Sequence, residues 1–256
     1  MRQEWGDPVV LLHGLGVSGR YYSALGLLLA GKRRVIVPDL PGWGRSERPP
    51  RPLGVEAAAE VLAEFLGVEG HRRPALVANS LGCQIVVALA QGHPELVGRM
   101  VLIAPTVDPR YRSWARQSAR LALDWALEPP SLWPIVLRDY SRMGAGRIVA
   151  TAAAALEDRL ETRLPSISLP ILVLRGERDA LTTLAWARSC AALAARGRFA
   201  PVPGAAHAAH YSHPRLVATL VEAGALARPG ADGGAARSGR ARGRDHGPAA
   251  RGDRGR

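Results

Sequence analysis

Short apolar runs alternate with helical stretches along most of the chain. The helical stretches include residues 21–30, 55–66 and 214–226. The apolar runs have the pattern of buried parallel strands, and they cover residues 8–14, 33–40, 74–80, 99–105, 170–176 and 198–204. The alternation predicts an α/β protein with a mostly parallel central sheet and helices on both of its faces.

One interval, residues 106–164, breaks this alternation. It contains no strand-like run and consists of helical pieces separated by prolines. A loop of this length inside a compact domain is rarely without structure, so we expect a helical cap inserted between two strands. The interval holds three of the six tryptophans and two of the five tyrosines, which predicts an apolar, aromatic inner surface. We therefore expect a core made of residues 1–105 and 165–228, a cap at 106–164 and a tail at 229–256.

The expected tail is rich in arginine and glycine and has no aromatic, β-branched or large aliphatic side chain. Such a segment cannot bury enough apolar surface to offset the entropy of ordering, so we expect it to be disordered. It also carries much of the net charge of +12, because residues 228–256 hold eight Arg and three Asp. The other basic residues do not cluster into a binding stripe, so apart from a weak tether in the tail we expect no nucleic-acid partner.

The remaining composition is that of an ordinary globular protein, with 256 residues of which 47% are hydrophobic. No run approaches the roughly 18 apolar residues that a membrane helix needs, and the first residues do not form a secretory signal. We therefore expect a cytoplasmic protein without a membrane partner. Cys83 and Cys190 form neither a disulfide framework nor a metal-binding pattern, so we expect two buried helical residues, no metal and no cofactor.

The strongest chemical signal is the segment Ala78-Asn79-Ser80-Leu81-Gly82, between a predicted buried strand and a predicted helix. A sharp strand-to-helix turn presents a serine hydroxyl above the edge of the sheet, and small residues two positions before and after it let the backbones approach. Free N–H groups and the helix dipole then favour developing negative charge. Ser80 is therefore the candidate nucleophile, and Ala78 is a mild departure from the strict G-x-S-x-G form.

The segment HGLG, residues 13–16, closes the first predicted strand. We expect it to present the N–H of Leu15, and the turn after Ser80 to present the N–H of Leu81, to one developing charge. Two such backbone donors stabilise the tetrahedral intermediate of acyl transfer. Leu15 and Leu81 are therefore the candidate oxyanion hole.

A serine hydroxyl also needs a base that takes its proton and an acid that orients the base. His207 is the candidate base because it lies in the loop after the last predicted strand, whereas His210 and His213 approach the final helix. Asp179 is the candidate acid because it lies three residues beyond the end of the fifth predicted strand, which gives the order Ser, Asp, His. Asp108, after an earlier strand, is a competing acid.

Five motifs now stand in a fixed order: HGLG at 13–16, DLPGWGRSERP at 39–49, ANSLGC at 78–83, LRGERD at 174–179 and PGAAH at 203–207. In this order they resemble the α/β-hydrolase superfamily. They are most similar to its small capped members, which include esterases, meta-cleavage-product hydrolases and cofactor-free haloperoxidases. The resemblance covers about residues 7–226. It implies a triad of Ser80, Asp179 and His207 with an oxyanion hole at Leu15 and Leu81.

Two further expectations follow from the resemblance. In the family, the segment DLPGWGRS forms a turn beside the active site, so Trp43 is a candidate substrate contact, together with Trp114 and Trp133 in the expected cap. The family usually has a two-strand hairpin before its HG strand, and this chain starts almost at that strand. We expect that this hairpin is absent or that the start of the chain was set too late.

The expected activity is hydrolysis of an ester-like carbonyl bond in a small, largely apolar substrate through an acyl-enzyme. The alternative within the same class is hydrolysis of a carbon–carbon bond in a vinylogous diketone, which uses the same triad. The alternative from another class is a non-catalytic α/β-hydrolase scaffold that binds a partner, although all three triad residues are present.

Overall fold

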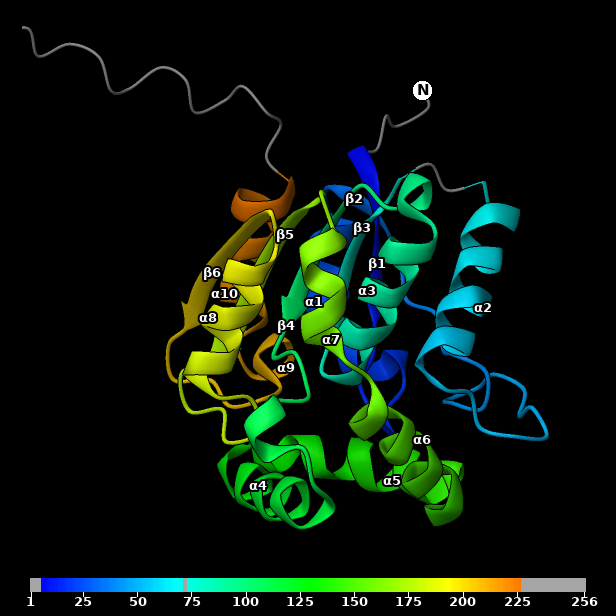
Figure 1. Cartoon of the computed structure of the whole chain (residues 1–256), viewed down its shortest axis with the longest axis vertical. Coiled ribbons are helices and arrows are strands. Elements are labelled where there is room, and N and C mark those ends of the chain that lie inside the picture. Colours follow the sequence, from blue (N-terminus) through cyan, green and yellow to red (C-terminus); the bar gives the residue numbers. More distant parts are fainter. Residues whose placement is uncertain (1–5, 71–72, 227–256) are drawn as a thin grey trace, which may run out of the picture. The chain divides into compact units, whose positions relative to one another are not determined.

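Six strands form one parallel sheet in the computed structural model, which describes residues 6–70 and 73–226 (Figure 1). The strands are β1 (Gly6–Leu12), β2 (Arg33–Ile36), β3 (Ala75–Asn79), β4 (Arg99–Ile103), β5 (Pro170–Gly176) and β6 (Arg196–Val202). Their order is β2-β1-β3-β4-β5-β6, and each pairing is parallel. The predicted α/β class is confirmed; the expected tail, residues 229–256, lies outside the described residues.

Helices cover both faces of this sheet. They are α1 (Ser23–Ala30), α2 (Val55–Val68), α3 (Leu81–Gly92), α8 (Leu184–Leu193), α9 (Ala209–Ser212) and α10 (Pro214–Val221). Side chains alternate along β1, so that Val10 and Leu12 join one apolar core with α2, α3 and α8. Val9 and Leu11 join a second core with α1 and α10. Because both faces are covered, the central strands are apolar at most successive positions, and for this reason the sequence shows them as nearly continuous apolar runs.

Edge strand β2 is shorter than predicted. It ends at Ile36, whereas the sequence predicted a strand over residues 33–40. Pro38 follows two residues later and has no N–H to donate to a strand ladder, which favours the end of the strand here. Strand β2 occupies the edge of the sheet beside β1 and runs parallel to it.

The helices predicted between the fourth and fifth strands are present. They are α4 (Trp114–Leu127), α5 (Trp133–Met143), α6 (Ala145–Glu157) and α7 (Leu160–Arg163). The Ser113 side chain caps α4 by accepting a hydrogen bond from the N–H of Arg116, and Gly144 ends α5 with a φ of 84°. Figure 1 shows α4, α5 and α6 grouped beyond the ends of the strands. These three helices therefore lie over the edge of the sheet where chemistry was predicted.

Short 3-10 turns connect several of these elements: η1 (Gly19–Tyr22), η2 (Pro94–Leu96), η3 (Pro109–Tyr111), η4 (Pro130–Leu132) and η5 (Leu164–Ser166). A π-helical turn, η6 (Glu222–Leu226), follows α10. Cys83 on α3 and Cys190 on α8 are buried free thiols, as predicted. Within 6–70 and 73–226, no helix combines the length and the apolar character that crossing a bilayer requires.

Candidate active site

Ser80 occupies a strained turn between β3 and α3. Its φ of 56° and ψ of −121° lie in a region that residues with a side chain rarely adopt. The N–H of Ser80 donates to the carbonyl of Ile103 at 3.0 Å, which ties the turn to the end of β4. Helix α3 begins at the next residue, Leu81. The geometry is that of a serine held above the end of a sheet strand.

Two glycines allow the backbones around Ser80 to approach each other closely. A Cβ on Gly82 would lie 2.7 Å from the carbonyl oxygen of His13 and 2.8 Å from that of Leu12. A Cβ on Gly14 would lie 3.1 Å from the Cβ of Ser80. The start of α3 therefore packs directly against the end of β1, and only a residue without a side chain fits at Gly82.

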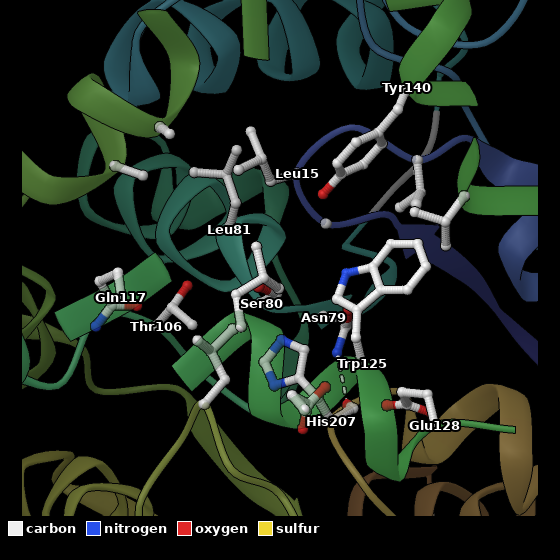
Figure 2. Close-up of a pocket in the computed structure, with 18 of the residues that line it drawn as sticks. Leu15, Asn79, Ser80, Leu81, Thr106, Gln117, Trp125, Glu128, Tyr140 and His207 are labelled. Atoms are coloured by element: carbon white, nitrogen blue, oxygen red, sulfur yellow. Dashed lines mark hydrogen bonds between the residues drawn. The ribbon is translucent and has the colours of Figure 1, made fainter. Parts of the chain in front are cut away.

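His13 fixes the loop after β1. Its Nε2 accepts a hydrogen bond from the N–H of Leu40 at 3.2 Å, so its Nδ1 carries the proton and donates to the carbonyl of Gly14 at 3.1 Å. Burial lowers the pKa of His13, which keeps the ring neutral. The loop places Leu15 beside Ser80 and Leu81 at the cavity (Figure 2). As the first residue of α3, Leu81 has an N–H without an acceptor inside the helix.

The structure brings His207 and Asp179 together. His207 Nδ1 lies 3.1 Å from Asp179 Oδ2, and both side chains are buried. The other carboxylate oxygen of Asp179 accepts the N–H groups of Leu181 and Thr182, each at 2.8 Å. Three hydrogen bonds thus orient this carboxylate, so its second oxygen is aimed at the imidazole.

The charges around His207 favour the protonated ring. Burial opposes protonation, but the charge and the hydrogen bond of Asp179, with the charges of Asp124 and Glu128, raise the pKa of His207 to about 9. His207 Nε2 is buried and has no hydrogen-bond partner within the described ranges. Ser80 and His207 both line the cavity, without a direct hydrogen bond between them in this structure.

The competing acid, Asp108, has other partners. Its carboxylate accepts two hydrogen bonds from the guanidinium of Arg110, at 3.2 and 3.0 Å, and one from the hydroxyl of Thr183 at 2.6 Å. Although burial opposes ionisation, these hydrogen bonds hold the pKa of Asp108 below its ordinary value. The structure therefore places Asp179, and not Asp108, against His207.

The other two histidines of the C-terminal cluster do not line the cavity. His210 is fully buried between the rings of Tyr21 and Tyr22, each at 4.3 Å between centroids. Burial lowers the pKa of His210 to about 3. His213 lies beside the hydroxyl of Ser212 at 2.9 Å.

A cavity of about 180 Å³ opens in front of Ser80, between the sheet edge and the helices of the insertion (Figure 2). Trp114 and Trp133 line it, and their contact with substrate stays a prediction. Trp43 does not line this cavity. Its ring is buried, with its centroid 4.9 Å from that of the His13 ring, and it lines a separate small pocket. The structure thus places the ring of Trp43 in the apolar core and away from the cavity that holds Ser80.

Further residues of the cavity were not predicted. Asn79 donates from Nδ2 to the carbonyls of Ile103 at 3.2 Å and of His207 at 3.3 Å, the latter drawn as the dashed line in Figure 2. Its place directly before Ser80 was the available sequence signal. Val17, Tyr21 and Leu181 were also missed, and they come from the core. Most other side chains that the prediction missed come from the insertion, where no local pattern indicates which residues face inward; they include Gln117, Asp124, Trp125, Glu128 and Tyr140.

The chain matches the family model described as "Alpha/beta hydrolase family" over residues 9–220. It is 27% identical to the pimeloyl-[acyl-carrier protein] methyl ester esterase of Edwardsiella ictaluri, over 80% of this chain and 88% of that protein. It is 41% identical to the 2-hydroxymuconate semialdehyde hydrolase of Pseudomonas sp. strain CF600, over 38% of this chain and 36% of that protein.

Over 39% of this chain it is 32% identical to uncharacterized proteins of Mycobacterium tuberculosis and Mycobacterium bovis, and the match spans 29% of their length. Among solved structures, an esterase from Thermogutta terrifontis superposes with a TM-score of 0.72. That likeness covers 86% of this chain and 89% of the esterase at 24% identity, so it supports the fold alone.

Proposed function

The chain belongs to the alpha/beta hydrolase family, and from this premise we propose that it is a serine hydrolase. Its substrate is an ester of a small, largely apolar molecule, and its intermediate is an acyl-enzyme on Ser80. The observation that carries the proposal is that the strained turn of Ser80 and the ring of His207 line the same cavity. Asp179 orients that ring, with its Oδ2 3.1 Å from His207 Nδ1. A serine held in this way and facing an oriented imidazole is the arrangement that acyl transfer needs.

Acylation starts when the neutral imidazole of His207 takes the proton of the Ser80 hydroxyl through Nε2. The Ser80 oxygen then bonds to the carbonyl carbon, and the resulting oxyanion accepts hydrogen bonds from the N–H groups of Leu15 and Leu81. Asp179 stabilises the imidazolium through Nδ1. The imidazolium returns its proton to the leaving alcohol as the ester bond breaks, which leaves Ser80 acylated.

Deacylation repeats these steps with water. His207 takes one proton from a water molecule while the oxygen of that water attacks the acyl carbon. The N–H groups of Leu15 and Leu81 then bind the second oxyanion. The collapse of this intermediate breaks the bond to Ser80, which recovers the proton from His207. The products are a carboxylic acid and an alcohol.

The lining of the cavity favours an ester over the carbon–carbon alternative. A ring-cleavage dienoate carries a carboxylate, which needs a cationic partner when it leaves water. Within the described residues no Lys or Arg lines the cavity, whereas Asp124 and Glu128 do. The remaining lining is mainly aliphatic and aromatic, so it suits an uncharged, apolar acyl or alcohol group.

The proposal is tested with Ser80→Ala and a short p-nitrophenyl ester. We expect kcat to fall at least about 1,000-fold, because the nucleophile is lost while the fold stays intact. Ser189→Ala, an exposed position on α8, serves as the matched control and retains the wild-type rate. Undiminished turnover by folded Ser80→Ala protein contradicts the assignment.

Substrate charge is tested by comparing a neutral aryl ester with a ring-cleavage dienoate on the wild-type enzyme. We expect measurable kcat/KM only for the ester, because the carboxylate of the dienoate meets Asp124 and Glu128 in the cavity. If kcat/KM for the dienoate exceeds kcat/KM for the neutral ester, the carbon–carbon alternative is supported instead.

A further inference from the structure

Two acidic side chains lie one helical turn apart at the C-terminal end of α4. Asp124 is in the last turn of the helix, and Glu128 is the residue that caps its end. They are 3% and 8% exposed, respectively. Residues four apart share one side of a helix, so both carboxylates face the same way.

The C-terminal end of a helix is an unfavourable position for buried carboxylates. The C-terminal end of a helix carries partial negative charge, which repels acidic side chains. Burial adds a second cost, since it raises the pKa of Asp124 and raises that of Glu128 to about 7. The stability of α4 therefore does not explain why acidic residues occur here. Their hydrogen-bond partners on two other loops do.

Each carboxylate binds the backbone beside one member of the proposed triad. Asp124 Oδ1 accepts the N–H of Ala180, the residue after Asp179, at 3.1 Å. Glu128 Oε1 accepts the N–H of Ala208, the residue after His207, at 2.5 Å. The two N–H groups belong to different loops, one after β5 and one after β6. A single helix of the insertion thus fixes both loops.

On the premise of the proposed function, we propose that Asp124 and Glu128 are positioning residues, which clamp the loops of Asp179 and His207 to α4 and hold acid and base in register. Glu128 complements Asn79, which binds the carbonyl of His207 from β3. The backbone of His207 is therefore held from the sheet on one side and from the insertion on the other. Neither carboxylate needs to touch the substrate in this role.

The clamp also sets the charge around the base. Both carboxylates raise the pKa of His207, in addition to Asp179. The titratable and charged groups that interact with Asp124 and Glu128 from other elements, within the described residues, are Tyr21 on η1, Arg175 on β5, Asp179 after β5 and His207 after β6. Replacement by the amide keeps a hydrogen-bond acceptor and removes the charge, so the two effects are separable.

The test compares alanine and amide variants at both positions. In Glu128→Ala and Asp124→Ala we expect kcat on a neutral ester to fall about 10- to 100-fold with little change in KM, because the triad is misplaced and the substrate contacts are not. Glu128→Gln and Asp124→Asn restore most of kcat. In these amide variants the acid limb of kcat/KM moves to lower pH, because a negative charge beside His207 is gone.

Glu157→Gln is the matched control, since Glu157 is an exposed acidic residue at the end of α6 in the same insertion. It leaves kcat and the pH profile unchanged. The clamp is overturned if folded alanine variants retain wild-type kcat, if the loss appears in KM alone, or if the amides fail to restore kcat.

A second measurement does not depend on ester turnover. The ring of His207 is followed by NMR in protein with isotope-labelled histidine, and its signals are identified by their loss in His207→Gln. We expect the Nδ1 proton bonded to Asp179 to be observed in the wild type and Glu128→Gln, and to be lost by exchange in Glu128→Ala. An unchanged signal in Glu128→Ala contradicts the clamp, whereas absence of esterase activity in the wild type contradicts only the proposed function.

Discussion

At the scale of single residues, the site depends on a backbone conformation that its neighbours enforce. Ser80 has a positive φ, which costs a residue with a side chain about 1–3 kcal/mol. The close contact of Gly82 with the carbonyls of His13 and Leu12 leaves the turn no room to relax. The strain is therefore held by the packing of α3 against the end of β1.

Gly82→Ala should disrupt this packing. The new Cβ would meet two backbone carbonyl oxygens at under 3 Å, which cannot move without shifting β1. We expect a loss of about 1–3 kcal/mol in the free energy of unfolding, measured by urea denaturation. Gly67→Ala is the control, because nothing lies within 4 Å of its Cβ on α2, and we expect a gain of about 0.5–1 kcal/mol there. Equal stability of the two variants contradicts this packing.

Substitutions at Asp179 and at Asp108 should have different effects on kcat. Asp179→Asn keeps the size of the side chain but removes the charge that stabilises the His207 imidazolium, so we expect kcat to fall by about 1,000-fold or more. Asp108→Asn disturbs the ion pair with Arg110 and leaves kcat within about threefold of the wild type. Steady-state kinetics on one ester check both; the reverse ranking would make Asp108 the acid.

The activity should also depend on pH in the alkaline range. Acylation requires neutral His207, and the pKa of this ring is raised from 6.5 to about 9. We expect kcat/KM to rise with pH and to reach its half-maximal value near 9, because the imidazole is protonated and inactive as a base below that pH. A half-maximal value at or below 6.5, measured in buffers of constant ionic strength, contradicts the charge arrangement around His207.

Residues of the site could be predicted from the sequence where the signal lies in the neighbouring residues. Ser80 and His207 follow from their immediate setting at the ends of strands. The choice between Asp179 and Asp108 needed the fold, because both follow strands and only the loop geometry shows which one reaches the imidazole. Trp43 lies in the core and not at the cavity, and composition cannot indicate the direction of its ring.

At the scale of elements, the insertion holds the loops of the site as well as covering it. Helix α5 contributes Asp139, whose Oδ2 accepts the N–H and the hydroxyl of Ser18 at 2.9 and 2.6 Å. It also contributes Tyr140, whose ring packs on Gly16, where a Cβ would lie only 2.1 Å from Cε1. Helices α4 and α5 together thus contact the loops that carry the acid, the base and Leu15.

Asp139→Ala should therefore affect both stability and rate. It leaves the N–H of Ser18 without its buried acceptor, which we expect to cost about 1–3 kcal/mol of unfolding free energy. The loop of Leu15 loosens as a result, so kcat falls while KM changes less. Urea denaturation and steady-state kinetics are compared with Glu157→Ala, an exposed position on the insertion that should change neither. A stable Asp139→Ala protein with wild-type kcat shows that α5 does not position this loop.

Element types were predictable from the sequence, and element ends were less so. The six strands follow from apolar runs because both faces of the sheet are buried. The end of β2 at Ile36 has a local signal in Pro38, but the apolar run over residues 33–40 continues past it, so the prediction placed the end too late. Likewise, the helical character of residues 106–164 was predictable, but the inward-facing side of α4, with Asp124 and Glu128, depends on how the helix docks.

At the scale of the whole molecule, the parallel sheet explains why distant residues meet. The C-terminal ends of β1, β3, β5 and β6 lie at one edge, so the loops with Leu15, Ser80, Asp179 and His207 converge there. The order of strands in the sheet sets the distances between these loops. That order comes from pairings between segments far apart in the chain, so the sequence predicted the set of residues and not their separations.

The central claim is that Ser80 is a nucleophile activated by His207. A fluorophosphonate probe tests it most directly, because the attacking oxygen bonds to phosphorus, fluoride leaves, and the adduct stays on the protein. Mass spectrometry of the labelled, digested protein should find one adduct, on the peptide that contains Ser80, absent from Ser80→Ala and formed much more slowly in His207→Ala. An adduct that persists in Ser80→Ala, or folded wild-type protein that hydrolyses esters without being labelled, contradicts the account.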